Sequence, residues 1–279
     1  MSTQKVWFIT GASKGLGLSF VKTLLTQGYR VAATSRKVED LHNSIGSTSE
    51  NFLPLSVDIK DENSVGAAIE ATVKHFGKLD VIVNNAGYGL IGSLEEISDA
   101  EARENFNVNV FGSLNVIRKA MPYLRAQRSG HIFNISSIGG LTGNFPGFGI
   151  YCATKFAVNG FTEALAAESS EFGIKATVVE PGYFRTNFLS AGSITTPKNE
   201  IADYKAAREV QRLHQEEIDG NQANDPDKAA IALIKVAEAE TAPLHLLLGN
   251  DAKGLAFEKL ASLEANFKEW DAITVSTAF

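Results

Sequence analysis

Residues 6–27 set a buried strand, a glycine-rich turn and a helix in immediate succession. Val6-Trp7-Phe8-Ile9-Thr10 is a nearly continuous apolar run, which is typical of a strand buried on both faces. Gly11, Gly15 and Gly17 follow at once, and residues 16–27 have the apolar spacing of a helix. Glycine lets the backbone turn tightly and approach a pyrophosphate, and the N-terminus of a helix attracts anions. This order of elements favours a nucleotide-binding unit.

The spacing of these glycines is Gly-x-x-x-Gly-x-Gly, which is neither the common dinucleotide fingerprint nor a phosphate loop ending in Gly-Lys-Ser/Thr. A turn that merely packs a helix against a strand is the alternative interpretation. The position of the turn, at the first strand-to-helix junction of the chain, favours nucleotide binding.

The alternation of strand and helix continues along the chain. Apolar runs predict further strands at residues 30–36, 52–57, 79–83, 131–135, 176–179 and 244–249. Helical spacing predicts helices at about residues 63–76, 99–125, 151–172, 227–239 and 255–267. The stretch 99–125 is broken in character at residues 107–112, where Asn109 inside an apolar helix needs a hydrogen-bond partner. We therefore predict an α/β fold, a Rossmann-type doubly wound parallel sheet of about seven strands with helices on both faces. Residues 1–279 are expected to form a single domain of this kind.

Short polar or glycine-containing motifs follow several of the predicted strands. They are residues 11–17, Asp58, residues 84–87, Ser136-Ser137 and Pro181-Gly182. Open α/β sheets bind ligands in the crevice at the carboxyl ends of their strands. We therefore expect these motifs to meet in one site.

The end of the second predicted strand indicates the choice of cofactor. An NAD-preferring fold places an acidic residue there to bind the ribose 2′-hydroxyl, whereas this chain has Ser35 followed by Arg36. Arg36 can pair with a 2′-phosphate through charge-assisted hydrogen bonds, and Lys14 could approach the same group. This pattern favours NADP(H) over NAD(H). The alternative is that both residues are ordinary surface cations.

Tyr151 and Lys155 form a candidate acid/base pair. Four residues apart in a predicted helix, they share one face, so that an ammonium lies beside a phenol. A free tyrosine has a pKa of about 10, and a neighbouring cation is expected to lower that pKa toward neutrality. Such a tyrosine can exchange a proton with a carbinol oxygen. Taken alone, the pattern is weak, because a tyrosine and a lysine at this spacing on a helix are usually an amphipathic surface pair.

Taken together, these motifs resemble those of the classical short-chain dehydrogenase/reductase family. The matching positions are residues 10–17, residues 84–87, Asn109, residues 135–137, residues 151–155, and Pro181-Gly182 with Thr186. The resemblance implies that Tyr151 is the general acid/base, that Ser137 polarises the substrate carbonyl, and that Lys155 modulates the tyrosine and binds the nicotinamide ribose. Asn109 would hold a water that links Lys155 to solvent. Ser136 is not expected to be the catalytic serine, because the family uses the second of the two.

The resemblance also implies the cofactor contacts. Asp58 would meet the adenine, Asn85 the adenosine side of the cofactor, and Thr186 the nicotinamide carboxamide. The full set of residues assigned to the cofactor is Gly11, Ser13, Lys14, Gly15, Leu16, Gly17, Ser35, Arg36, Asp58, Ile59, Asn85, Ala86, Gly87, Tyr151, Lys155, Pro181, Gly182, Phe184 and Thr186.

The chain departs from the plain family pattern from about residue 183. Residues 188–214 read as an insertion with loops at Ser190-Ala191-Gly192-Ser193 and Thr195-Thr196-Pro197 and a polar helix from Ile201. Long ordered loops are often functional, so we expect residues 183–215 to cover the substrate as a lid. A surface excursion is the alternative. The expected substrate wall, which could instead be core, is Phe145, Phe148, Tyr183, Phe184, Phe188 and Leu189.

The C-terminal segment has apolar residues at helical spacing where many tetrameric relatives have a glycine-rich ending. They are Leu255, Phe257, Leu260, Leu263 and Phe267. This tail resembles the branch that contains bacterial relatives of retinol and 17β-hydroxysteroid dehydrogenases. We expect a homodimer or homotetramer and favour the dimer.

Composition excludes several other classes. A net charge of -6 without clustered cations argues against a nucleic acid or an anionic membrane as partner. One cysteine, Cys152, cannot form an internal disulfide and is compatible with a reducing cytosol. Five residues before the first predicted strand are too few for a signal peptide, and no apolar run of about 20 residues occurs, so we expect a cytoplasmic protein. The five histidines show no ligand spacing, and no metal site is predicted.

The sequence therefore predicts an NADPH-dependent carbonyl reductase, or alcohol dehydrogenase in reverse, that acts on an apolar ketone or aldehyde. A steroid or retinoid alcohol oxidoreductase is a second hypothesis. A preference of the lid for bulky substrates would favour it. A non-catalytic NADP-binding sensor is a third, which predicts damage to the Ser137, Tyr151 and Lys155 set; the sequence shows none.

Overall fold

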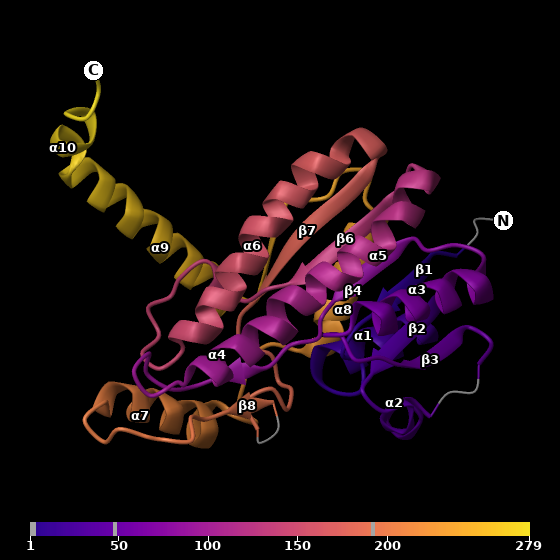
Figure 1. Cartoon of the computed structure of the whole chain (residues 1–279), viewed down its shortest axis with the longest axis horizontal. Coiled ribbons are helices and arrows are strands. Elements are labelled where there is room, and N and C mark those ends of the chain that lie inside the picture. The colour runs from indigo at the N-terminus through magenta and orange to yellow at the C-terminus, as the bar shows by residue number, and fades with distance from the viewer. Residues whose placement is uncertain (1–3, 47–48, 191–192) are drawn as a thin grey trace.

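The computed structural model describes residues 4–46, 49–190 and 193–279. Within these ranges, seven strands form one parallel sheet in the order β3-β2-β1-β4-β6-β7-β9 (Figure 1). The strands are β1 (Val6–Ile9), β2 (Arg30–Ser35), β3 (Phe52–Ser56), β4 (Val81–Asn84), β6 (Gly130–Ile135), β7 (Ile174–Pro181) and β9 (His245–Leu248). The predicted doubly wound sheet of about seven strands is confirmed.

The sequence of strand β1 is apolar throughout because both of its faces are buried. Trp7 and Ile9 belong to a core on one face of the sheet, and Val6 and Phe8 belong to a core on the other. All four side chains are at most 1% exposed, because successive residues of a strand point to opposite faces and both faces are covered. Strand β1 pairs with β2 on one side and β4 on the other, so it lies at the centre of the sheet.

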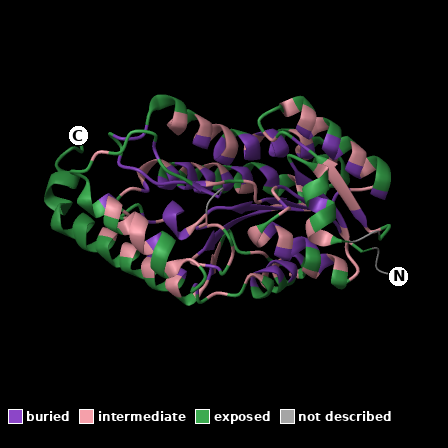
Figure 2. Cartoon of the chain, turned by 90° about the horizontal axis from the view of Figure 1, so that it is seen from below, coloured by how far each residue is buried: buried purple, intermediate pink, exposed green. Residues whose placement is uncertain are grey.

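Helices cover both faces (Figure 2). On the Trp7 face lie α1 (Gly15–Thr26), α2 (Val38–Ile45) and α8 (Pro226–Glu238). On the Phe8 face lie α3 (Glu62–Phe76), α5 (Gly112–Gln127) and α6 (Gly149–Ser169). The remaining elements are β5 (Gly89–Leu90), α4 (Asp99–Phe106), η1 (Asn107–Phe111), η2 (Ile138–Gly140), η3 (Ser170–Phe172), β8 (Ile194–Thr195), α7 (Lys205–Arg212), η4 (Leu213–Ile218), α9 (Asn250–Glu269) and α10 (Asp271–Val275).

Local capping explains several predicted boundaries. The Asp225 side chain accepts a hydrogen bond from the Asp227 amide at 2.9 Å, and Pro226 occupies the first turn of α8. Asp61 caps α3 in the same way, and Gly77, at φ 82°, ends it.

The helical stretch expected over residues 99–125 is present as α4, the π-helical turn η1 and α5, and η1 lies at the predicted break and places Asn109 in the interior. Other predicted boundaries were wrong. Thr195, expected in a loop, pairs with Leu90 through the two-residue strand β8, which is too short to leave an apolar pattern. Ala191 and Gly192, in the other expected loop, lie outside the described residues. The helix expected from Ile201 begins at Lys205.

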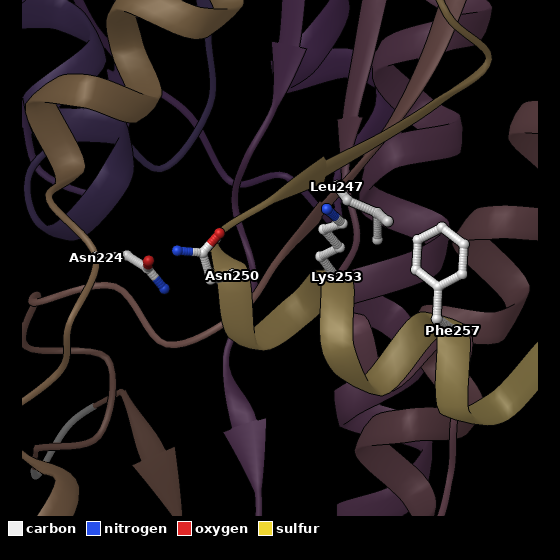
Figure 3. Close-up of a pocket in the computed structure, with 6 residues that line it drawn as sticks. Asn224, Leu247, Asn250, Lys253 and Phe257 are labelled. Atoms are coloured by element: carbon white, nitrogen blue, oxygen red, sulfur yellow. The ribbon is translucent and has the colours of Figure 1, made fainter.

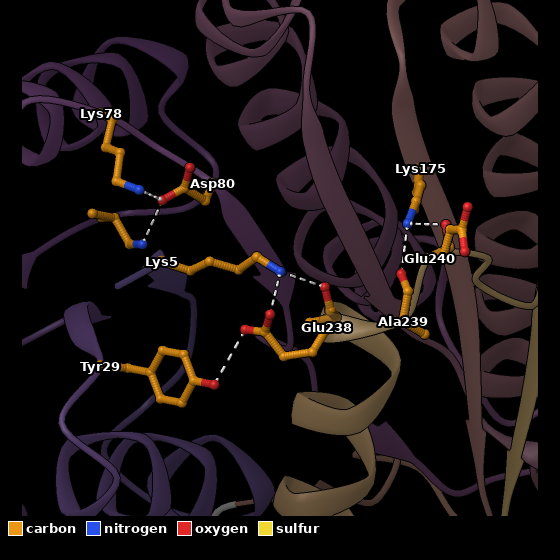
Figure 4. A network of polar contacts seen from close by, with 10 residues as sticks. Lys5, Tyr29, Lys78, Asp80, Lys175, Glu238, Ala239 and Glu240 are labelled. Carbon is orange, nitrogen blue, oxygen red and sulfur yellow. Dashed lines mark hydrogen bonds and ion pairs between the residues drawn. The ribbon is translucent and has the colours of Figure 1, made fainter. Parts of the chain in front are cut away.

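A polar network ties down the amino ends of the strands (Figure 4). Lys5 donates hydrogen bonds to the Ala237 carbonyl at 2.7 Å and to Glu238 at 2.8 Å. Asp80 accepts from the Val6 amide at 2.7 Å. These contacts join β1, β4 and α8 at the amino ends of the strands, so the carboxyl ends on the opposite side of the sheet are left to other loops. No helix of the described chain is long and apolar enough to cross a membrane.

Candidate active site

A cavity of about 760 Å³ lies at the carboxyl ends of the strands. Beside it the chain order reverses, since β2 and β3 extend the sheet on one side of β1 and β4 begins the other half. The loops after β1, β4, β6 and β7 all line the cavity, as their motifs predicted.

The glycine turn after β1 requires residues without a side chain. At Gly11, φ is 64° and an added Cβ would lie 2.8 Å from Ala86 Cα. At Gly17, an added Cβ would lie 2.5 Å from Asn85 Nδ2. Asn85 Nδ2 in turn donates hydrogen bonds to the Thr10 and Gly11 carbonyls at 2.9 and 3.0 Å. The loops after β1 and β4 therefore form one unit; Gly17 serves its packing and does not line the cavity.

Gly15 marks the open side of the same turn. Its φ of 59° suits glycine, and an added Cβ would lie 3.9 Å from Cβ of Thr186, which comes from the loop after β7. The N-terminus of α1 follows the turn and offers backbone N–H groups to an anion. A gap lined by glycine backbone, a helix N-terminus and a threonine fits a pyrophosphate.

The end of β2 carries positive charge. Lys14 and Arg36 both line the cavity, and burial and the nearby Arg36 charge lower the pKa of Lys14. The Ser35 hydroxyl accepts a hydrogen bond from the Lys37 amide at 3.2 Å, which shapes the turn beyond the strand. Asp58 and Ile59 line the same region, at the end of β3.

Ser137, Tyr151 and Lys155 meet where β6 ends and α6 begins. The Ser137 hydroxyl accepts a hydrogen bond from the Gly139 amide at 3.0 Å, and a side-chain hydrogen bond joins Ser137 to Tyr151. Lys155 Nζ lies 5.7 Å from the centroid of the Tyr151 ring and donates to the Ile135 carbonyl at 2.9 Å.

Burial controls the proton affinities of this group. It raises the pKa of Tyr151 well above its usual value, although the hydrogen bond from Ser137 opposes that shift. It lowers the pKa of Lys155 to about 8. The expectation that Lys155 lowers the tyrosine pKa toward neutrality is therefore wrong, because desolvation of the phenolate has the largest effect on that pKa. Tyr151 is a protonated phenol here.

Asn109 lies behind this group and does not line the cavity. Its Oδ1 accepts from the Tyr88 amide at 3.0 Å, and its Nδ2 donates to the Tyr88 carbonyl and to the Thr154 hydroxyl, each at 3.1 Å. An added Cβ at Gly87 would lie 3.0 Å from Asn109 Oδ1 and 3.8 Å from Lys155 Nζ. The predicted need of this buried amide for partners is confirmed.

The comparisons with known proteins agree on one family. The family model for short chain dehydrogenase matches residues 5–195. The chain is 37% identical to "Oxidoreductase BOA17" of Botryotinia fuckeliana, over 98% of this chain and 99% of that protein. This chain belongs to the short-chain dehydrogenase family. As such, it is an oxidoreductase that interconverts CH–OH and C=O groups.

Further relatives of this dehydrogenase cover most of its length. "3-ketodihydrosphingosine reductase" of Bacteroides thetaiotaomicron is 37% identical over 88% of each chain. The solved structure of a short-chain dehydrogenase from Streptomyces avermitilis has a TM-score of 0.91 at 34% identity, with 100% of both chains covered. More distant solved structures hold NADH (a 3-ketoacyl-(acyl-carrier-protein) reductase from Brucella melitensis) or NADP (ElxO).

The structure places nearly all predicted site residues of the dehydrogenase in one cavity. Except for Gly17, every residue assigned to the cofactor lines it, as does Ser137. The predicted substrate wall lines it too, although Pro146, between Phe145 and Phe148, does not.

Sequence reasoning missed other functional candidates in the dehydrogenase. Tyr88, Val108, His214 and Gln222 line the cavity. None of them belongs to a matched motif. His214 lies in η4, inside the segment that was predicted as a lid, but no motif in the sequence distinguished it from its neighbours.

A buried network beneath Ser136 was also missed. Asn159 Nδ2 donates to Glu180 Oε1 at 2.8 Å, Asn159 Oδ1 accepts from the Ser136 hydroxyl at 2.5 Å, and His245 lies 3.1 Å from Glu180. Both serines line the cavity, but the Ser136 hydroxyl is bonded to α6 and fixes the end of β6 against that helix, whereas the Ser137 hydroxyl is joined to Tyr151. The spacing of Asn159 from Lys155, one helical turn, was a usable signal.

Proposed function

We propose that this dehydrogenase is an NADPH-dependent carbonyl reductase that acts on an apolar ketone or aldehyde. The observation that carries the proposal is the joined pair of hydroxyls, Ser137 and Tyr151, beside a buried Lys155 at one end of an aromatic cavity. The other end of that cavity carries Lys14 and Arg36.

The lining of the cavity fits an NADP(H) molecule. The bare backbone at Gly11 and Gly15 and the N-terminus of α1 suit the pyrophosphate. Arg36 and Lys14 suit a 2′-phosphate, and no acidic side chain stands at positions 35 and 36 to bind a ribose 2′-hydroxyl instead. Asp58 and Ile59 would meet the adenine, and Thr186 the nicotinamide carboxamide.

The protein contributes geometry and a proton. A bound nicotinamide supplies the hydride that reaches the carbonyl carbon. Ser137 and Tyr151 donate hydrogen bonds to the carbonyl oxygen, and Tyr151 passes its proton to that oxygen as charge develops there. Lys155 holds the ribose and stabilises the phenolate that Tyr151 becomes. Asn109, which lies near Lys155, would hold a water that links Lys155 to solvent.

We also propose that residues 1–279 form one domain whose residues 183–215 serve as a substrate lid. Tyr183, Phe188, Leu189 and His214 of this segment line the cavity. Phe188 packs on Tyr151 with ring centroids 6.0 Å apart. The lid therefore places apolar surface directly over the proposed acid.

An apolar wall favours a substrate with a hydrocarbon chain or ring next to its carbonyl. Buried or half-buried apolar side chains surround the acid, from the residue after β5, from the loop before α6 and from the lid. They include Ile91, Phe145, Phe148, Phe188, Leu189 and Ile194. The name of the relative from Bacteroides thetaiotaomicron, a reductase of a 3-keto lipid base, is consistent with this class.

We propose that the dehydrogenase associates with a second copy of itself through α9. Ala252 and Ala256 are buried against the body, and the same face of the helix continues as Leu260, Phe267 and Trp270, which are 56–65% exposed. Figure 1 shows that α9 projects away from the sheet, and Figure 3 shows the open pocket where it departs. The apolar face of α9 is buried at the start of the helix and exposed further along. A second copy of α9 would cover the exposed part with an apolar face of its own.

A cytoplasmic location is proposed with it. The free thiol of Cys152 is buried and its pKa is raised to about 11 by burial, so it is an apolar filler that a reducing compartment suits. Fractionation of cells that express the tagged full chain tests the location.

The test of the proposed function is a titration of the purified chain with NADPH and NADH, followed by an absorbance screen of ketones and aldehydes. We expect selective NADPH binding and NADPH oxidation that increases with the apolar length of the ketone. Binding without turnover of any carbonyl would favour the sensor hypothesis. Turnover of steroid ketones or retinal alone would favour the steroid or retinoid hypothesis.

A further inference from the structure

Tyr183 and His214 form a hydrogen-bonded pair that lines the cavity beside the apolar cluster around Tyr151. Tyr183 follows Gly182 at the end of β7, and His214 lies in η4, so the lid brings them together. The Tyr183 hydroxyl lies 2.9 Å from His214 Nε2, and both residues line the cavity.

The hydrogen bonds fix the direction of this pair. His214 Nδ1 lies 2.7 Å from the Val210 carbonyl, which can only accept, so Nδ1 carries a proton. Burial lowers the pKa of His214, so the ring is neutral at pH 7 and Nε2 is an acceptor. Tyr183 must therefore donate its only proton to His214. Burial, with Asp251 and Cys152 nearby, raises the pKa of Tyr183 to about 12, so the phenol stays protonated.

With its proton committed, the Tyr183 oxygen can only accept a hydrogen bond from a molecule in the cavity. It stands close to the reacting centre, because Tyr183 packs against the apolar cluster that contains Tyr151 and both residues line the cavity. Phe148 packs on His214 and on Tyr151, with ring centroids 4.9 and 6.0 Å apart. Tyr183 is half-buried, and an acceptor that is shielded from water and left unpaired costs free energy, so this position discriminates between substrates.

We propose that Tyr183, oriented by His214, accepts a hydrogen bond from the substrate and selects apolar ketones that carry a hydroxyl near the reacting carbonyl. The inference rests on the proposed carbonyl reduction and adds the substrate class. Tyr183 is then a specificity-determining residue, and His214 is a positioning residue that keeps the tyrosine an acceptor.

The test compares matched long-chain ketones that carry either a hydroxyl or a methoxy group one or two carbons from the carbonyl. A methoxy oxygen cannot donate. The wild type should prefer the hydroxy ketone over the methoxy ketone in kcat/KM by about tenfold, the worth of one hydrogen bond of about 1.4 kcal/mol. Tyr183→Phe should bring this ratio close to one, whatever its effect on the absolute rates.

His214→Phe should change the preference between the two ketones in a way that a purely structural role of His214 would not. It frees the Tyr183 proton for donation, so the methoxy ketone should gain relative to the hydroxy ketone. Tyr204→Phe, an exposed tyrosine of the same segment that does not line the cavity, is the matched control and should leave the ratio unchanged. NADPH affinity, measured for each variant, reports on folding.

The outcomes separate the two proposals. Turnover of both ketones with a ratio that Tyr183→Phe leaves unchanged overturns the role of Tyr183 alone. A wild type that binds NADPH but reduces neither ketone nor any plain ketone contradicts the carbonyl reductase itself, and this inference falls with it.

Discussion

At the scale of single residues, the site depends on groups whose proton affinity is set by burial. Tyr151 is a protonated phenol because its phenolate would be desolvated, and a protonated phenol is the form that reduction of a carbonyl needs. Lys155 is shifted the opposite way, because burial disfavours its ammonium. Tyr151 is thus a proton donor, and the neighbouring Lys155 loses its positive charge at moderately high pH.

Lys155 should therefore set the alkaline limit of reduction. With its pKa lowered to about 8, it is charged below that pH and neutral above it. We expect kcat/KM for NADPH to fall as pH rises through about 8, because this parameter reports on the free protein. In Lys155→Arg, whose side chain stays charged, the break should disappear even though turnover is lower. A break that persists in this variant would contradict the assignment.

Arg36 should determine the choice between the two nicotinamide cofactors. Arg36→Ala removes a charge-assisted contact worth about 1.5–3 kcal/mol, so NADPH affinity should fall by about 10- to 100-fold. NADH affinity should change by less than about threefold. Lys37→Ala, which removes an adjacent exposed cation outside the cavity, is the control and should change neither. Equal losses for NADPH and NADH in Arg36→Ala would contradict the 2′-phosphate site.

The residues that could be predicted are those fixed by their place in a motif. Ser137, Tyr151 and Lys155 follow one strand and begin the next helix, so their proximity is a local property of the chain. Tyr183 and His214 are 31 residues apart and meet only because the lid folds back. The direction of the tyrosine pKa shift was also missed, because it depends on burial that no sequence spacing reports.

At the scale of elements, the lid is held by one buried carboxylate. Glu96 accepts hydrogen bonds from the Ser93 and Ile201 amides at 2.6 and 2.7 Å and from Arg208 of α7 at 2.8 Å. Its side chain is 0% exposed. Burial alone would raise the pKa of Glu96, but these hydrogen bonds and the Arg208 charge outweigh it and lower that pKa.

Glu96→Gln should loosen the lid. The loss of charge weakens the bond to Arg208, and we expect a stability loss of about 1–3 kcal/mol near pH 7. The Glu96 contribution is present above the unfolded-state pKa of about 4.5 and is lost as pH falls through the lower folded-state pKa. The difference between wild type and variant should therefore vanish in acid. Thermal unfolding measures it, and limited proteolysis of residues 196–204 reports on the lid.

Glu95→Gln is the matched control. Glu95 is exposed and accepts only from the Tyr204 hydroxyl among the contacts seen in the described residues. Its stability loss should be below about 0.5 kcal/mol. Equal losses in the two variants would show that Glu96 does not hold the lid.

Most elements could be predicted, because the seven main strands are apolar runs and the long helices keep a strict period. The elements that were missed have no such pattern. Helix α2 buries only Leu41, and β5 and β8 have two residues each. These are consequences of tertiary packing.

At the scale of the whole molecule, the projecting helix α9 should determine assembly. The double substitution Leu260→Glu with Phe267→Glu places charges on the apolar face and should shift the chain from dimer to monomer. Ala261→Glu with Ala265→Glu, at exposed positions on the other side of the helix, is the control and should leave the dimer intact. Light scattering after size-exclusion chromatography measures the mass. A monomeric wild type would contradict this assembly.

The measurement that tests the central claim most directly follows the hydride itself. The full chain is incubated with NADPH dideuterated at nicotinamide C4 and an apolar ketone, and the product is analysed by mass spectrometry. We predict an alcohol with one deuterium on the carbinol carbon, and no alcohol from Tyr151→Phe, which should still bind NADPH within a few fold. An alcohol without deuterium, or undiminished product from Tyr151→Phe, would contradict the account.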